Sequence, residues 1–147
     1  MNPPTPDHAP FSQSDSPRPR GASRPLPICW AILDDATAAR ELSALAVWVR
    51  WLATRYILAP RTIPPCWHHH ASLVEELSAL RTAWLAAFAP DVPSVTPLDW
   101  HIMFWPARNR LEETVTYAGC TKQDHHDDRP AAWLTTPTEN SASSTQT

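Results

Sequence analysis

Cysteine and histidine residues gather in two short clusters of this chain, and these residue types are the usual ligands of zinc in proteins. Cys66 is followed by Trp67 and three consecutive histidines, and Cys120 is followed by His125 and His126. The spacings, Cys-x2-His or Cys-x3-His in the first cluster and Cys-x4-His or Cys-x5-His in the second, suit two halves of one tetrahedral zinc site. The predicted metal ligands are Cys66, His70, Cys120 and His125, with His69 and His126 as alternatives.

The same residues also have an ordinary interpretation. The histidines at 68–70 can be a solvated loop, Cys66 a small buried apolar residue, and the second cluster the start of a polar tail. A third interpretation is a nucleophilic enzyme, in which Cys66 or Cys120 attacks and a neighbouring histidine is the base. With only Gly21 and Gly119 in the chain, no glycine-rich turn is available to hold an oxyanion or a phosphate. We therefore predict no catalytic residue and no enzymatic activity.

Both ends of the chain differ in composition from its centre. Residues 1–27 contain eight of the seventeen prolines, and residues 129–147 are polar apart from Trp133 and Leu134. Such segments cannot bury enough apolar surface to offset the entropy of ordering them. The sequence predicts a disordered Pro/Ser-rich tail at 1–27, a Trp-rich helical domain at 28–128 and a disordered polar tail at 129–147. A domain of roughly 100 residues buries only about two-thirds of the surface that its unfolded chain exposes, so a bound metal or a partner would add to its stability.

Apolar periodicity predicts two helices in the central segment. The first stripe is formed by Leu42, Leu45, Val49, Leu52 and Tyr56. Its spacings of three and four residues predict an amphipathic helix of about 20 residues that ends before Pro60. Ser72 and Glu75 form a Ser-x-x-Glu capping box, which predicts the start of a second helix. The apolar face of that helix is formed by Leu73, Leu77, Leu80, Trp84 and Phe88.

A third helix is predicted after the prolines at 90–97. Thr96 is its expected N-cap, with Pro97 at the first helical position. Pro106 is expected to kink or restart this helix, and the segment 114–117 is β-prone by composition. We expect His101 to be a core histidine with a satisfied hydrogen bond. Together these patterns predict a mainly α protein, a small three- to four-helix domain between disordered tails.

Charge and hydropathy argue against nucleic acid and the membrane as default partners, without excluding nucleic acid. The net charge is −3, and the basic residues are scattered along the chain. Binding to phosphate needs a basic stripe, so nucleic acid is not indicated, although Arg108 and Arg110 keep a DNA-binding regulator as an alternative. The longest apolar stretch, 42–59, contains Arg50 and Arg55, which each cost about 2.5–3.5 kcal/mol at the centre of a bilayer. We expect no membrane span.

The three cysteines do not form an even-numbered disulfide framework, and the N-terminus carries no secretory signal. Disulfides are rare in the reducing cytoplasm, so we expect a cytoplasmic protein. Eight tryptophans are a high number for 147 residues. Tryptophan is enriched where proteins meet their partners, and in a small domain it is also core. The sequence predicts an unknown protein partner, without naming it.

An ordered set of landmarks resembles an uncharacterised protein family. The landmarks are Cys66-Trp67, His70, the run Leu73 to Trp84, Trp100, Arg110-Leu111 and Gly119-Cys120, with a histidine five residues later. They resemble a domain of unknown function found in small actinobacterial proteins, often on plasmids, integrative elements and phages. The resemblance covers about residues 45–126. It implies a mobile-element accessory protein and assigns no catalytic role to any residue.

These observations predict a small non-enzymatic accessory or interaction protein, stabilised by structural zinc. The alternatives are a Cys/His or zinc-dependent enzyme and a DNA-binding regulator. Zinc is the one cofactor that the residue types indicate.

Overall fold

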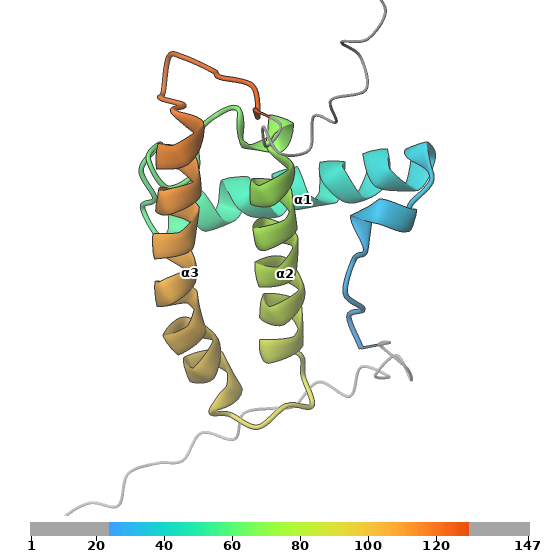
Figure 1. Ribbon diagram of the computed structural model, residues 1–147. Helices are drawn as coiled ribbons and strands as arrows, with labels where there is room; N and C mark the ends of the chain where they lie inside the picture. The colour runs from blue at the N-terminus through green and yellow to red at the C-terminus, as the bar shows by residue number, and fades with distance from the viewer. Residues whose placement is uncertain (1–23, 130–147) are drawn as a thin grey trace, which may run out of the picture.

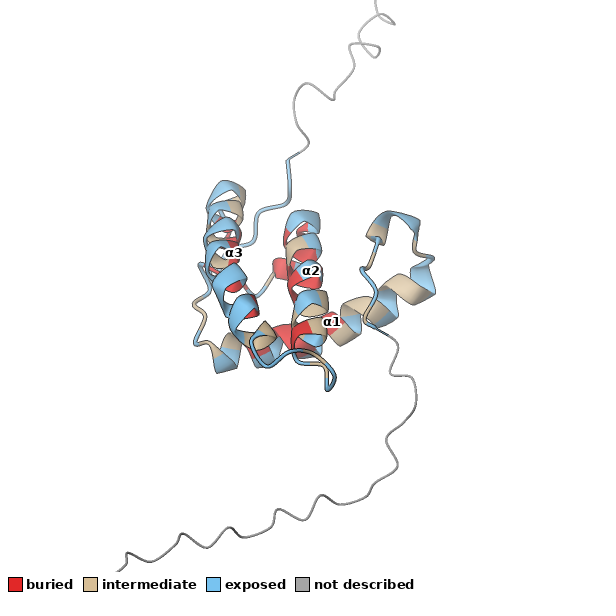
Figure 2. Cartoon of the chain, turned by 90° about the horizontal axis from the view of Figure 1, so that it is seen from below, coloured by how far each residue is buried: buried red, intermediate tan, exposed pale blue. Residues whose placement is uncertain are grey.

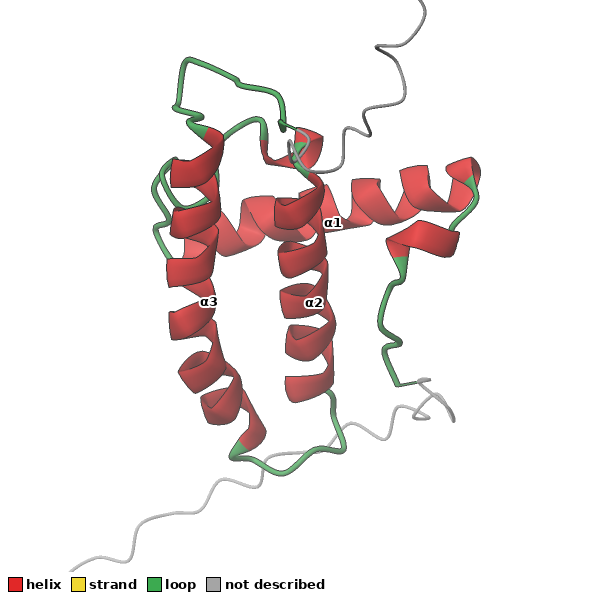
Figure 3. Ribbon diagram, viewed as in Figure 1, coloured by secondary structure: helices red, strands yellow, loops and turns green. Residues whose placement is uncertain are grey.

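A computed structural model describes residues 24–129, and within this range the chain forms helices and loops without a strand (Figure 3). The α-helices are α1 (Asp35–Arg55), α2 (Ala71–Ala87) and α3 (Thr96–Ala118). Short 3-10 turns, η1 (Trp30–Ile32) and η2 (Trp67–His69), precede α1 and α2. The predicted mainly α class, a domain of three to four helices, is confirmed, with three α-helices among the described residues. The predicted disordered tails lie outside the described residues, apart from 24–27 and 129.

The helices α2 and α3 lie side by side and run in opposite directions, joined by the loop 88–95, while α1 crosses behind them (Figure 1). The start of α2 and the end of α3 therefore meet at the same end of the molecule. The first Cys/His cluster immediately precedes α2, and the second follows α3. This antiparallel arrangement brings together two clusters that are about fifty residues apart in the sequence.

The core lies where the three helices face one another (Figure 2). Its buried side chains come from α1 (Leu45, Trp48, Val49, Leu52), α2 (Leu73, Val74, Leu77, Leu80, Ala87) and α3 (Trp100, Phe104, Ala107, Leu111, Val115). Most of the core side chains that α1 and α2 contribute belong to the apolar stripes predicted for these two helices. Burial of these side chains is the main source of helix stability in a protein of this size.

The start of α1 follows from the two acidic residues at 34 and 35. The Asp34 carboxylate accepts hydrogen bonds from the backbone N–H of Thr37 at 2.8 Å and from its hydroxyl at 2.8 Å. These bonds lower the pKa of the Asp34 carboxyl. Asp35 lies in the first turn, where a negative charge is favourable. The preceding segment 28–33, which periodicity leaves undecided between strand and cap, contains η1 and no strand.

The predicted capping box of α2 is wrong. The N-cap is His70, whose carbonyl accepts the Val74 N–H at 3.0 Å, and Ser72 already lies inside the helix. The 3-10 turn η2 leads directly into α2, so the helix begins before the box can act. The imidazole of His70 makes no capping bond and is free to point elsewhere.

The third helix is longer and more continuous than predicted. Val95 is its N-cap in place of Thr96, and the helix runs unbroken past Pro106, which is exposed to solvent. The β-prone segment 114–117 is helical, which corrects that expectation. Its Val115 is buried in the core, and the Thr114 and Thr116 hydroxyls donate to carbonyls four residues back. Tertiary burial has overridden the local β propensity.

Aromatic side chains fill the space between the second half of α2 and its neighbours. Trp100 is 4% exposed, stacks on Phe104 with centroids 4.7 Å apart and donates its indole N–H to the Leu80 carbonyl at 3.3 Å. The expectation for His101 is half right. Its Nε2 lies 2.8 Å from the Tyr56 hydroxyl, but the residue is exposed and not in the core.

Candidate metal centre

The loop before α2 places the first pair of candidate ligands. Pro64 is fully buried, and its carbonyl accepts the Trp67 N–H at 3.0 Å. The Cys66 carbonyl accepts the His69 N–H at 2.9 Å, which completes η2. Trp67 is buried and anchors this turn against the core. Cys66 and His70, at the two ends of the turn, therefore project from a rigid backbone.

The second pair is placed by the end of α3 and a tight turn. Gly119 has a φ of 77°, and its N–H donates to the Val115 carbonyl at 3.0 Å, which ends the helix in the left-handed conformation. The Thr121 hydroxyl then accepts the Asp124 N–H at 3.0 Å, and the Thr121 N–H donates to the Asp124 carbonyl at 2.9 Å. This turn sends the chain back toward α2 and carries His125 to Cys120.

The four predicted ligands lie together in the structure. One ligand atom from each of Cys66, His70, Cys120 and His125 falls within 4.8 Å of all the others. His70 Nε2 is 3.7 Å from Cys66 Sγ and 3.2 Å from Cys120 Sγ, and His125 Nδ1 is 3.8 Å from Cys120 Sγ. Sulfur and nitrogen ligands of a tetrahedral zinc ion lie about 3.5 Å apart, given bonds of about 2.3 and 2.0 Å. These separations are compatible with four residues that hold one metal ion.

The remaining nitrogen of each histidine contacts a carboxylate. His70 Nδ1 lies 2.6 Å from Asp128 Oδ1, and His125 Nε2 lies 2.9 Å from Asp127 Oδ1. His70 is 1% exposed, so its imidazole depends on protein partners for hydrogen bonding. In both residues the nitrogen that faces the sulfur atoms is left free to bind a metal.

The sulfur atoms of Cys66 and Cys120 are neighbours, and a bound cation would change how readily the thiols lose their protons. Burial raises the pKa of the Cys66 thiol, and the neighbouring Cys120 sulfur raises it further because two adjacent thiolates repel. The Cys120 sulfur is buried, accepts the His126 N–H at 3.2 Å and lies 3.4 Å from the His126 carbonyl oxygen. A divalent cation favours both thiolates, so metal binding and loss of the thiol protons are coupled.

The alternative ligands are not part of this cluster. The His69 ring is exposed and lies beside His125, with ring centroids 5.3 Å apart. His126 contributes its backbone N–H to Cys120, and its side chain is exposed. Burial lowers the pKa of His68, with a further decrease from the histidines around it. Among the described residues, the only group of three or more Cys, His, Asp or Glu side chains that can hold a metal is Cys66, His70, Cys120 and His125.

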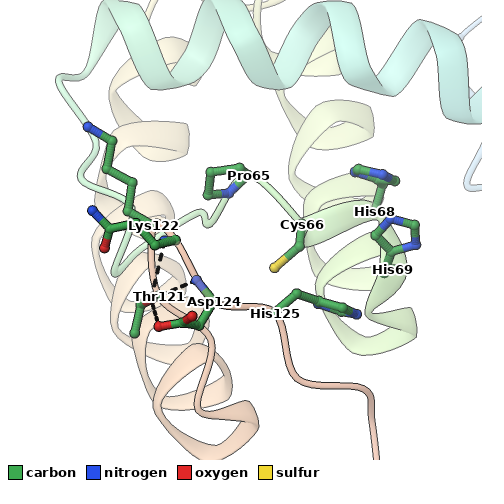
Figure 4. Close-up of a pocket in the computed structure, with 9 residues that line it drawn as sticks. Pro65, Cys66, His68, His69, Thr121, Lys122, Asp124 and His125 are labelled. Carbon is green, nitrogen blue, oxygen red and sulfur yellow. Dashed lines mark hydrogen bonds between the residues drawn. The ribbon is translucent and has the colours of Figure 1, made fainter.

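A shallow cavity of about 340 Å³ opens beside the cluster. Figure 4 shows Cys66 and His125 among its lining residues, together with the hydrogen bonds that close the Thr121–Asp124 turn. Only these two of the four ligands line the cavity, because His70 and Cys120 are buried behind them. The cluster is thus accessible from one side, through which an ion could enter.

The sequence interpretation overlooked two residues of this site. The sequence prediction gives Asp127 and Asp128 no part in the site, yet both carboxylates contact the candidate ligands His125 and His70. A signal was available in the run Asp124-His125-His126-Asp127-Asp128, because carboxylates next to ligating histidines commonly hold the imidazole ring in place.

None of the helices between residues 24 and 129 combines the length and the apolar character that a membrane crossing requires. Comparison of the chain with protein-family models, with curated proteins and with solved structures found no match.

Proposed function

We propose that this chain is a small non-enzymatic interaction protein whose helical fold is held together by one structural zinc ion. The observation that carries the proposal is the convergence of Cys66, His70, Cys120 and His125 from two distant segments. Two sulfur and two imidazole ligands in tetrahedral reach favour zinc over harder ions such as Mg²⁺ or Ca²⁺, which prefer oxygen. Four protein ligands complete the coordination, as in structural sites, whereas catalytic sites keep a position open.

The position of the site supports a structural role. The ligands join the turn before α2 to the chain that follows α3, at the end of the helix pair opposite the loop 88–95. The segment after Gly119 has few apolar contacts of its own, since Cys120 is the only residue at 120–129 that is buried. Small domains commonly use a metal where the core cannot hold a segment.

The interaction role is supported by apolar side chains left exposed on α3. Val95, Leu98, Ile102 and Trp105 are each more than half exposed and follow one another at spacings of three and four residues. Such a stripe on one helix face is typical of surfaces that contact another protein. The resemblance to actinobacterial mobile-element proteins favours an accessory role, and the three free cysteines favour the reducing cytoplasm.

The proposal is tested by the zinc-to-protein ratio of the purified full chain and by thermal melts with and without a chelator. We expect one zinc per chain and loss of the cooperative unfolding transition when zinc is removed, because metal binding contributes directly to folding. Zinc-free protein that is fully folded would contradict the proposal. Stoichiometric zinc that leaves without any effect on the melt would contradict the structural role and favour the enzymatic alternative.

Matched cysteine variants separate ligation from general effects of losing a thiol. Cys66→Ser and Cys120→Ser are expected to lose zinc and to melt like chelated protein. Cys29→Ser is the control, because Cys29 is exposed and lies before η1, away from the cluster.

The interaction role is tested by capture of partner proteins from the native host, with the wild type as bait and, in parallel, the variant Ile102→Asp, which places a charge on the exposed stripe of α3. If the wild type and Ile102→Asp capture the same partner proteins in equal amounts, the exposed stripe is not the binding surface.

A further inference from the structure

The four candidate ligands leave two contacts of the site unexplained. Asp128 Oδ1 approaches His70 Nδ1 to 2.6 Å, the shortest of the contacts around the cluster, and Asp127 Oδ1 approaches His125 Nε2 to 2.9 Å. The two histidines face the sulfur atoms through different nitrogens, Nε2 in His70 and Nδ1 in His125. Each carboxylate contacts the nitrogen on the far side of its ring.

A neutral imidazole carries one proton, and its position decides which nitrogen can bind a metal. An ionised carboxylate accepts hydrogen bonds and cannot donate one, so it selects the tautomer with the proton on the nitrogen that it contacts. In His70 that proton then lies on Nδ1, and in His125 it lies on Nε2. The opposite nitrogens, which point at Cys120, keep their lone pairs.

We propose that Asp128 and Asp127 are positioning residues that fix the two histidines in opposite tautomers, so that the metal is bound through Nε2 of His70 and Nδ1 of His125. This inference rests on the proposed metal site and deepens it. The carboxylates also hold the ring orientations and raise the basicity of the ligating nitrogens. Because both aspartates follow the last ligand within three residues, one short segment supplies a ligand and the orientation of two rings.

The local backbone explains why opposite tautomers are needed. His70 is the N-cap of α2 and is 1% exposed, so its ring reaches the sulfur atoms with its outer nitrogen, Nε2. His125 follows the tight turn at 121–124 and lies beside Cys120, so its inner nitrogen, Nδ1, is the nearer one. Each histidine accordingly has its own carboxylate partner, Asp128 for His70 and Asp127 for His125.

The tautomers can be read directly by NMR of the zinc-loaded, ¹⁵N-labelled full chain. Long-range ¹H–¹⁵N correlations distinguish a metal-bound nitrogen from a protonated one in each histidine ring. We expect His70 to be bound through Nε2 and His125 through Nδ1. Binding of both rings through the same type of nitrogen would overturn the proposal. Protein that holds no metal would overturn it together with the proposed function, whereas same-type binding leaves the metal site itself standing.

Zinc affinity provides a second readout that does not depend on the NMR assignment. Competition with a chromophoric chelator is expected to show a 10–100-fold loss of zinc affinity in Asp128→Ala, with a loss in the same range for Asp127→Ala. Asp128→Asn keeps an oxygen acceptor for the Nδ1 proton and is expected to recover part of the affinity. Asp91→Ala is the matched control, an exposed aspartate in the loop before α3. Unchanged affinity in Asp128→Ala, with wild-type stoichiometry, would overturn the proposal.

Discussion

The aromatic cluster between the helices and the Cys/His cluster at the other end of α2 differ in the kind of contact that joins their side chains. The aromatic cluster consists of Trp48, Trp51, Tyr56, Trp84, Phe88, Trp100 and Phe104. It gains its stability from many weak contacts over a large apolar area. The Cys/His cluster consists of four candidate ligand atoms that lie within 4.8 Å of one another.

The difference predicts how each region responds to change. Apolar packing is spread over many atoms, so one substitution removes a part of it and leaves the rest. A metal site is nearly all-or-none, because loss of one ligand leaves the other three with too little affinity to hold the ion in place. The two regions should therefore respond independently to substitution. In the aromatic cluster the loss of unfolding free energy should grow with the side-chain volume removed, whereas in the Cys/His cluster the loss of one ligand should release the metal completely.

Trp100→Ala is expected to have the largest effect on the aromatic cluster. The side chain is 4% exposed, and its removal leaves a cavity and eliminates the indole hydrogen bond to the Leu80 carbonyl. Truncation of a buried Trp typically costs about 3–5 kcal/mol. Urea denaturation of the zinc-loaded protein should show this loss, while the zinc-to-protein ratio stays at the wild-type value.

Trp105→Ala is the control, because Trp105 lies on the same helix and is 64% exposed. The Arg108 guanidinium lies 4.8 Å from the centroid of the Trp105 ring. An exposed contact of this kind contributes about 0.5–1 kcal/mol. Equal destabilisation by the two variants, or loss of zinc in Trp100→Ala while it is still folded, would refute the independence of the two regions.

The sequence predicts the elements that depend on periodicity and misses those that depend on tertiary contacts. The stripe Leu42 to Tyr56 predicts α1 correctly, because an amphipathic face is a local property. The segment 114–117 has a β propensity, which the burial of Val115 in the core overrides. Likewise, Ser72 and Glu75 resemble a capping box, but the 3-10 turn before them starts the helix earlier.

The candidate site divides in the same way. Cys66 and Cys120 could be selected from the sequence because residue type and spacing carry most of the information about zinc ligands. The choice of His70 over His69 follows from the turn η2, which buries one ring and exposes the other. The sequence places Asp127 and Asp128 beside a candidate ligand, but the histidine ring that each carboxylate contacts depends on the chain reversal after Gly119, which the sequence does not reveal.

Gly119→Ala tests how the end of α3 delivers Cys120 to the metal cluster, and we expect an intermediate effect. Gly119 has a φ of 77°, and a side chain in this left-handed conformation costs roughly 1–2 kcal/mol. An added Cβ would meet only the His126 ring at 3.9 Å, an ordinary contact, so the cost comes from the backbone. Denaturation of the zinc-loaded protein measures it. Gly119→Asn should cost less, since Asn tolerates this conformation better; if Asn and Ala are equally destabilising, the backbone explanation is wrong.

The smallest effect is expected at the contact between the segment before α1 and α2, which belongs to neither cluster. The Trp30 indole N–H donates to the Ser78 hydroxyl at 2.9 Å, and Ser78 is buried while Trp30 is partly exposed. Ser78→Ala removes the acceptor, but water can reach the indole, so we expect a loss of about 0.5–1.5 kcal/mol. Ser43→Ala on α1 is the matched control, because its exposed hydroxyl bonds only to the Ala39 carbonyl within the same helix. Both substitutions gain the same helix propensity, so the difference between their unfolding free energies isolates the Trp30 bond. No difference would mean that the segment before α1 is held by apolar contact alone.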